Sequence, residues 1–160
     1  AIVLFTGSAQ TGKTFLARRV EALLVADSRH AYLLEGENLL QGLDADLSAA
    51  DPSFAAERVR RYGEVARLLI DTGLIVVSTS KTFGINYQRM AEMIRTLVQP
   101  APVIAVHMSR AGEEPPPNTD LHFAGPQDFD AAARQILEEL KRRGVLIQPS
   151  GTKSTIQYSI

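Results

Sequence analysis

One segment carries the residue types and the spacing of a phosphate-binding loop. It matches the P-loop pattern G-x-x-x-x-G-K-[ST] with Gly7, Ser8, Ala9, Gln10, Thr11, Gly12, Lys13 and Thr14. Gly7 and Gly12 permit backbone conformations that turn successive N–H groups inward, and the helix that follows adds its positive N-terminal end. We expect Lys13 to reach the β- and γ-phosphates of ATP and the Thr14 hydroxyl to bind Mg²⁺. The alternative is a Gly-rich turn that caps a helix and binds nothing. An apolar run before the loop and an amphipathic stretch after it favour nucleotide binding.

Two carboxylates follow the second predicted strand, at Glu35 and Glu37. On an extended segment, side chains two positions apart share one side. With Lys13 they form the predicted catalytic set: one carboxylate accepts the proton of an acceptor hydroxyl and the other holds Mg²⁺-bound water. The residues do not say which glutamate does which. A solvated acidic turn is the alternative, and the presence of the P-loop favours the catalytic interpretation.

The elements that must position these residues alternate along the chain. Short apolar runs predict strands at 1–6, 31–34, 74–78, 103–107 and 120–123, and helical periodicity predicts helices at 13–26, 54–71, 87–98 and 129–143. A short helix or turn at 38–43 precedes a polar loop at 44–53, with Ser53 as N-cap of the next helix and Gly73 as its C-cap. This order predicts an α/β, three-layer P-loop NTPase-type fold, with a mostly parallel five-stranded sheet and helices on both faces. Ligands should then sit at the C-terminal ends of the strands.

Composition sets broad limits on the function. A chain of 160 residues, 45% hydrophobic, is long enough for one domain with a core. The net charge of −1 argues against a general electrostatic grip on nucleic acid or membranes, and the absence of Cys excludes disulfides and Cys-ligated zinc. No signal-peptide pattern or spanning apolar run is visible, which predicts a cytoplasmic location. Because the chain opens in an apolar strand without Met, we expect residues 1–160 to be a single kinase-like domain excised from a longer chain.

Beyond the P-loop, the sequence from residue 1 to about 146 resembles the adenylyl-sulfate (APS) kinase family. The resemblance rests on LEGENL at 34–39, ERVRR at 57–61 and DTGLIVV at 71–77, where the family reads Leu-Asp-Gly-Asp-Asn, Glu-Asn-Ile-Arg-Arg and Asp-Ala-Gly before an apolar strand. It implies ATP-dependent phosphorylation of the APS 3′-hydroxyl, with ATP and Mg²⁺ as cofactors and Asn38 in substrate binding. The implied partners are the nucleotide and a small acceptor, with a homodimer or a fused domain as further contacts and no nucleic acid or membrane.

The differences from the family pattern fall on the acceptor side. Glutamates replace both family aspartates, Leu40 replaces an Arg, and Arg58 replaces an Asn. Residues 48–50, 54–55 and 81–83 also depart from the pattern, and residues 110–119 stand where the family has a long lid. Hydrogen bonds to charged groups contribute about 1.5–3 kcal/mol each, so these losses predict weak binding of APS. The sequence therefore leaves open a kinase for another small acceptor, or a catalytically impaired nucleotide-binding domain with a regulatory or structural role.

Other polar residues carry weaker indications. His30, His107 and His122 have no spacing typical of a shared metal site, and His107 lies within a predicted strand, which favours a structural role. Three arginines at 58, 60 and 61 either face an anion or form the solvated side of a helix. Lys81 follows the third strand at the ligand edge and is a candidate phosphate contact.

Overall fold

The computed structural model describes residues 1–79, 85–125 and 128–147. They form a five-stranded sheet in the order β2-β3-β1-β4-β5, with every pairing parallel. The strands are β1 (Ile2–Gly7), β2 (Ala31–Glu35), β3 (Ile75–Thr79), β4 (Val103–Ser109) and β5 (Leu121–Ala124). The helices are α1 (Lys13–Ala26), α2 (Phe54–Asp71), α3 (Tyr87–Val98) and α4 (Phe129–Arg142), and a short 3-10 helix, η1, covers Gly36–Leu39. Each predicted strand and long helix is confirmed: α1, α2 and α3 have the predicted ends, and the ends of the strands and of α4 differ by at most two residues.

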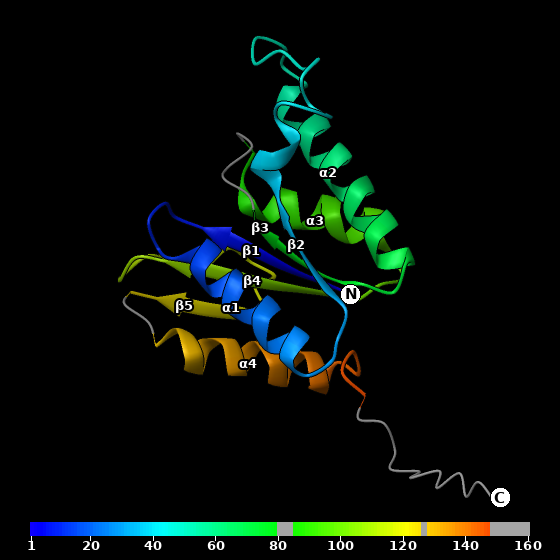
Figure 1. The fold of residues 1–160 in the computed structure, drawn as a ribbon. Helices are drawn as coiled ribbons and strands as arrows, with labels where there is room; N and C mark the ends of the chain where they lie inside the picture. The colour runs from blue at the N-terminus through cyan, green and yellow to red at the C-terminus, as the bar shows by residue number, and fades with distance from the viewer. Residues whose placement is uncertain (80–84, 126–127, 148–160) are drawn as a thin grey trace, which may run out of the picture.

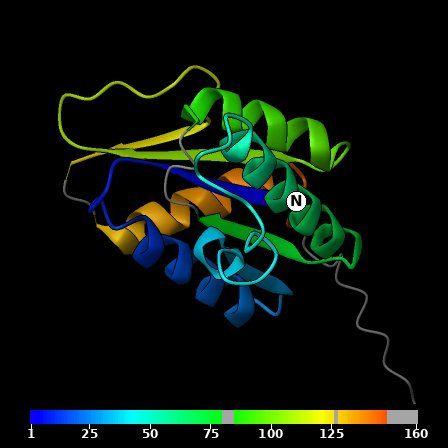
Figure 2. The ribbon, with the colours of Figure 1, turned by 90° about the horizontal axis from the view of Figure 1, so that it is seen from above.

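The helices cover both faces of the sheet, as predicted. Helices α1 and α4 pack on one face and α2 and α3 on the other (Figure 1). Figure 2 shows the same layers from above. Alternation along β1 supplies both cores, because Val3 and Phe5 point toward α1 and α4 while Ile2 and Leu4 point toward α2 and α3. A strand buried on both faces reads as a continuous apolar run, which explains the apolar start of the chain.

The central position of β1 brings the site residues to one edge. Gly7 is in register with Met108 of β4, and Glu35 at the end of β2 is in register with Thr79 of β3. The C-terminal ends of the parallel strands therefore meet the P-loop and the glutamates at the same edge of the sheet, where ligands bind in such folds.

The connections differ from the predictions in detail. The short helix begins at Gly36, two residues earlier than predicted. Ser53 occupies the N-cap position of α2, but its side chain does not cap the helix. Its backbone N–H and its hydroxyl both donate to Asp51 Oδ1 at 2.7 Å, so the expectation of a capping Ser53 side chain is wrong. Gly73 follows α2 with φ of +90°, as a C-terminal glycine does.

None of the helices that the structure describes has the length and apolar character needed to cross a bilayer.

Candidate active site

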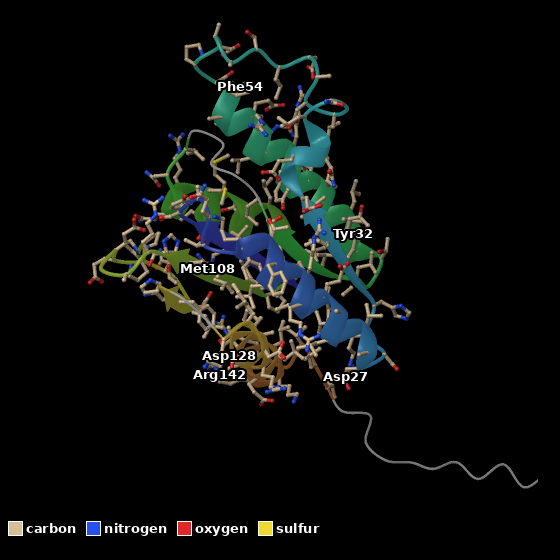
Figure 3. The ribbon with its side chains drawn as sticks, turned by 60° about the vertical axis from the view of Figure 1, so that its left-hand side comes forward. Asp27, Tyr32, Phe54, Met108, Asp128 and Arg142 are labelled. Carbon is tan, nitrogen blue, oxygen red and sulfur yellow. The ribbon has the colours of Figure 1, made fainter. Side chains whose placement is uncertain are left out.

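The P-loop connects β1 to α1 and is shaped by the close approach of its neighbours. Gly7 has φ of +128°, and a Cβ added there would lie 1.8 Å from the backbone oxygen of Met108 (labelled in Figure 3). Gly12 has φ of +86°, and its Cβ would lie 2.6 Å from the Phe129 ring. Both positions require glycine for space as well as for backbone conformation.

Hydrogen bonds from several elements hold the loop. The backbone oxygen of Ser8 accepts from Thr11 Oγ1 at 2.9 Å and from Lys13 Nζ. Tyr87 of α3 donates its hydroxyl to the backbone oxygen of Gly7 at 2.7 Å. Ser8 Oγ donates to Glu113 Oε2 at 2.6 Å, which ties the loop to the segment after β4. Contacts from β4, α3 and the loop itself thus shape the P-loop, and Lys13 Nζ donates to a backbone oxygen.

A cavity of about 500 Å³ brings most of the predicted site residues together. Its lining includes Ala9, Gln10, Thr11, Gly12, Lys13, Thr14, Glu35, Glu37 and Asn38. Phe15 and Thr79 complete it. Gly7 and Ser8, the first two residues of the motif, do not line the cavity and instead anchor the loop to β4. The phosphate-binding motif and the post-β2 acidic pair therefore share one space.

The two glutamates differ in their electrostatic surroundings. Glu35 Oε1 pairs with Arg18 of α1 at 3.4 Å, and the Arg18 side chain is largely exposed. Burial lowers the pKa of the Lys13 ammonium, and the charge of Glu37 opposes that shift. The charge of Glu37 therefore acts on the P-loop lysine, while Glu35 contacts Arg18 of α1.

The donor oxygens around the cavity fit a Mg²⁺ ion. Thr14 supplies a hydroxyl, and Glu35 and Glu37 supply carboxylates, which are the ligand types that Mg²⁺ prefers. No group of three or more His, Asp or Glu residues in the described part of the chain is arranged to hold a metal ion by itself. That arrangement suits an ion that keeps several waters and takes further ligands from substrate phosphates.

A second cavity of about 530 Å³ also borders the P-loop, and sequence reasoning missed it. It shares Gln10, Thr11 and Gly12 with the first cavity and adds residues from the ends of two strands and from α4. The added residues are Ser109, Arg110, Ala111, Gly125 and Phe129. The signal available in the sequence was positional, because the segments after β4 and β5 leave the sheet at the same edge as the P-loop.

Buried polar residues support the site from behind. Tyr62 of α2 is 1% exposed, and its hydroxyl contacts Ser78 Oγ at 2.5 Å and donates to the backbone oxygen of Leu34 at 2.8 Å. Burial raises the pKa of Tyr62, and the charges of the nearby glutamates add to that effect. Sequence periodicity does not reveal these contacts, because a pattern of apolar positions does not show which groups a buried hydroxyl meets.

His107 is 4% exposed and its Nδ1 lies 2.9 Å from Thr6 Oγ1, in agreement with a structural role. It is in register with His122 of β5, whose Nε2 lies 2.8 Å from Ser109 Oγ. The two imidazole rings are 5.9 Å apart, a neighbourhood that their spacing along the chain did not indicate. Burial lowers the pKa of His107, and His122 and Lys13 lower it further.

The three arginines at 58, 60 and 61, all on α2, form ion pairs within the chain. Arg58 pairs with Asp44, Arg60 with Glu57, and Arg61 with both Asp46 and Glu57. The Arg58–Asp44 and Arg61–Asp46 pairs connect α2 to the segment after β2. Lys81 and the neighbouring residues 82 and 83 lie outside the described residues, as does the tail from 148.

Comparison with known proteins adds a family to this geometry. A model of the family described as "Adenylylsulphate kinase" matches residues 1–115. Adenylyl-sulfate kinase of Aeromonas hydrophila is 40% identical over 97 residues, which cover 61% of this chain and 47% of that protein. Its counterpart in Yersinia pestis is 29% identical over 174 aligned positions, covering 91% of this chain and 80% of that protein. The chain spans about half the length of several curated relatives that it matches.

Comparison with solved structures points to the same family. A mutant of the Mycobacterium tuberculosis APS kinase superposes with a TM-score of 0.75 at 29% sequence identity, covering 88% of this chain and 96% of that one. The family match at 1–115 covers the P-loop and the acidic segment after β2, which supply most of the lining of the first cavity. On the sequence and on the fold, the chain belongs to the adenylyl-sulfate kinase family.

Proposed function

We propose that this chain transfers the γ-phosphoryl group of ATP to the 3′-hydroxyl of adenylyl sulfate. One observation carries the proposal: in a member of this family, residues 9–14 of the P-loop, both glutamates and Asn38 line a single cavity. The curated relatives that resemble it are named adenylyl-sulfate kinases. A phosphate donor site and acidic groups in one space are what phosphoryl transfer to a hydroxyl requires.

The donor side would hold ATP across both cavities. The backbone N–H groups of the loop and the positive end of α1 would bind the β- and γ-phosphates. Lys13 would exchange its bond to the Ser8 oxygen for phosphate oxygens, at little cost because one acceptor replaces another. The cavity beside Phe129 and Arg110 offers the remaining room for the nucleoside.

Mg²⁺, when bound, would neutralise the charge that develops on the transferring phosphoryl group. The Thr14 hydroxyl would hold the ion directly, and one of the glutamates would hold a water of its coordination shell.

The acceptor side would be formed by Glu35, Glu37 and Asn38. Glu37 would accept the proton of the attacking 3′-hydroxyl, because it lies near Lys13 and the transferring phosphoryl group. Glu35 already pairs with Arg18 and would serve the water shell of the ion. Asn38 would supply an amide to position the acceptor.

A coupled assay of ADP release tests the proposal. ADP should form from MgATP only when adenylyl sulfate is added. The Lys13→Ala variant should form no ADP even when adenylyl sulfate is present. Adenosine 5′-phosphate in place of adenylyl sulfate tests whether the sulfate is recognised. Tight nucleotide binding without acceptor-dependent ADP release would contradict the proposal and support the alternative of an impaired nucleotide-binding domain. The homodimer, the contact with a fused domain and the cytoplasmic location remain predictions.

A further inference from the structure

The segment 36–46 carries Glu37 and Asn38 to the cavity, yet it is built from short turns. Its backbone is closed by the Asp44 N–H, which donates to the Leu39 oxygen at 2.8 Å, and by the Gly42 N–H, which donates to the same oxygen at 3.2 Å. Turns of this kind fix local shape but not the position of the segment against the rest of the molecule. That position has to come from contacts with another element.

Asp44 makes such a contact from a buried position. The residue is 4% exposed, and its Oδ2 lies 3.4 Å from Nε of Arg58 on α2. The other oxygen, Oδ1, has no hydrogen-bond partner among the described residues. A buried carboxylate with one oxygen unpaired depends strongly on its counter-ion, because removing that cation leaves an uncompensated buried charge.

Arg58 is held on two sides, which makes it a fixed point. Its side chain is 12% exposed, and its guanidinium carbon lies 5.4 Å from the centre of the Phe54 ring. Phe54, labelled in Figure 3, begins α2. One turn further along α2, Arg61 donates to the Leu43 oxygen at 2.5 Å and pairs with Asp46. Two arginines of α2 therefore bind the C-terminal half of segment 36–46.

We propose that the buried Arg58–Asp44 pair is a positioning element for the acceptor side, which fixes segment 36–46 against α2 and so places Glu37 and Asn38 in the cavity. The pair lies outside the residues that line the cavity and acts through the backbone turn between Asn38 and Asp44. The expected change in KM and kcat rests on the proposed function. The expected change in amide exchange of 36–46 rests on the contacts alone.

Four variants test the pair. Arg58→Met leaves Asp44 buried without its cation, and Asp44→Asn keeps the shape while removing the charge. The double variant Asp44→Asn/Arg58→Met removes both charges. Arg67→Met is the matched control, because Arg67 lies on the same helix and pairs with Glu64 and Asp71 at the surface. Each variant is assayed well below its melting temperature for the KM of ATP, the KM of adenylyl sulfate and kcat, and by amide hydrogen exchange.

Arg58→Met should raise the KM for adenylyl sulfate about tenfold and lower kcat, with the KM for ATP changed by less than about twofold. Amides of 36–46 should exchange at least tenfold faster, and those of the P-loop should not. The double variant should be less impaired than Arg58→Met, and Arg67→Met should match the unmodified chain. If Arg58→Met does not fold, the same kinetic and exchange measurements are made on Asp44→Asn, with changes in the same direction expected.

Two results would overturn the inference. One is a lower melting temperature with unchanged exchange in 36–46, which would make the pair merely structural. The other is an equal rise in the KM of both substrates. Absence of any transfer by the unmodified chain would refute the proposed function instead, and the exchange measurement would still decide the role of the pair.

Discussion

The two sides of the cavity are held in different ways. On the phosphate side, Gly7 and Gly12 pack against the backbone of β4 and the ring of Phe129, and the loop lies between a fully buried strand and a helix. On the acceptor side, β2 is an edge strand and the segment after it is held to α2 by charged side chains. The phosphate geometry is thus encoded within a short motif. The acceptor geometry depends on pairs of residues that lie far apart in the sequence.

The largest expected effect comes from the phosphate side. Lys13→Ala should lower phosphoryl transfer by on the order of 10³-fold, because it removes a positioned charge from the developing transition state. It should also abolish tight binding of MgATP and MgADP, measured by titration calorimetry. Unchanged nucleotide affinity in this variant would show that the P-loop is not the donor site.

Next in size is the loss of a carboxylate on the acceptor side. Glu37→Gln should reduce kcat by about 10²-fold or more, the usual contribution of a general base, without weakening MgADP binding. Glu35→Gln should cost less, because Glu35 would act on a Mg²⁺-bound water and not on the proton of the attacking hydroxyl. Steady-state kinetics of both variants measure the difference. A larger loss in Glu35→Gln would exchange the two proposed roles.

A third comparison separates packing from backbone strain. Gly12 and Gly144 both have positive φ, but only Gly12 has a neighbour where a Cβ would stand. Gly12→Ala should lower the melting temperature more than Gly144→Ala and should weaken nucleotide binding about tenfold or more. Thermal unfolding with and without MgADP measures both effects. Equal shifts in the two variants would mean that the contact with Phe129 does not shape the loop.

The acceptor side can also be compared with a relative. The short 110–119 segment and Leu40 offer fewer donors to a sulfated nucleotide, so the KM for adenylyl sulfate should be about tenfold higher than in a relative with the long lid. The chain and the relative are to be assayed side by side at saturating MgATP. A KM equal to that of the relative would show that these differences do not weaken acceptor binding.

The smallest expected effect concerns His107, behind the P-loop. Its pKa lies below the ordinary value of 6.5 because of burial and the nearby His122 and Lys13, with Glu113 opposing. As pH falls, His107 is therefore protonated in the unfolded chain before it is protonated in the folded one. The contribution of neutral His107 to the stability of the fold is complete above pH 6.5 and is lost as pH falls toward the folded-state pKa. The melting temperature should drop by a few degrees between about pH 6.5 and 5. His107→Asn, which can keep the bond to Thr6, should flatten that decline, and an identical decline in both proteins would contradict the assignment.

The sequence predicts the phosphate side of the cavity better than the contacts that hold the acceptor side. The sheet, its helices and the phosphate loop were all predictable, because apolar periodicity and a contiguous motif encode them locally. The position of Glu35 and Glu37 at the cavity was predictable for the same reason, because both follow a strand, while their catalytic roles stay a prediction. The pairing of Arg58 with Asp44 could not be predicted, because an arginine on a helix face looks the same whether it meets solvent or a buried carboxylate. The neighbourhood of His107 and His122 needed the order of the strands, which residue spacing does not supply.

The most direct test of the proposed activity identifies the product. Phosphorus NMR of the chain with MgATP and adenylyl sulfate should show a new phosphomonoester on the 3′-oxygen, in an amount that matches the ADP formed. The same mixture with Lys13→Ala should show neither. ADP formed with release of inorganic phosphate, or a phosphate on any other oxygen of the acceptor, would contradict the assignment of this site to 3′-phosphoryl transfer.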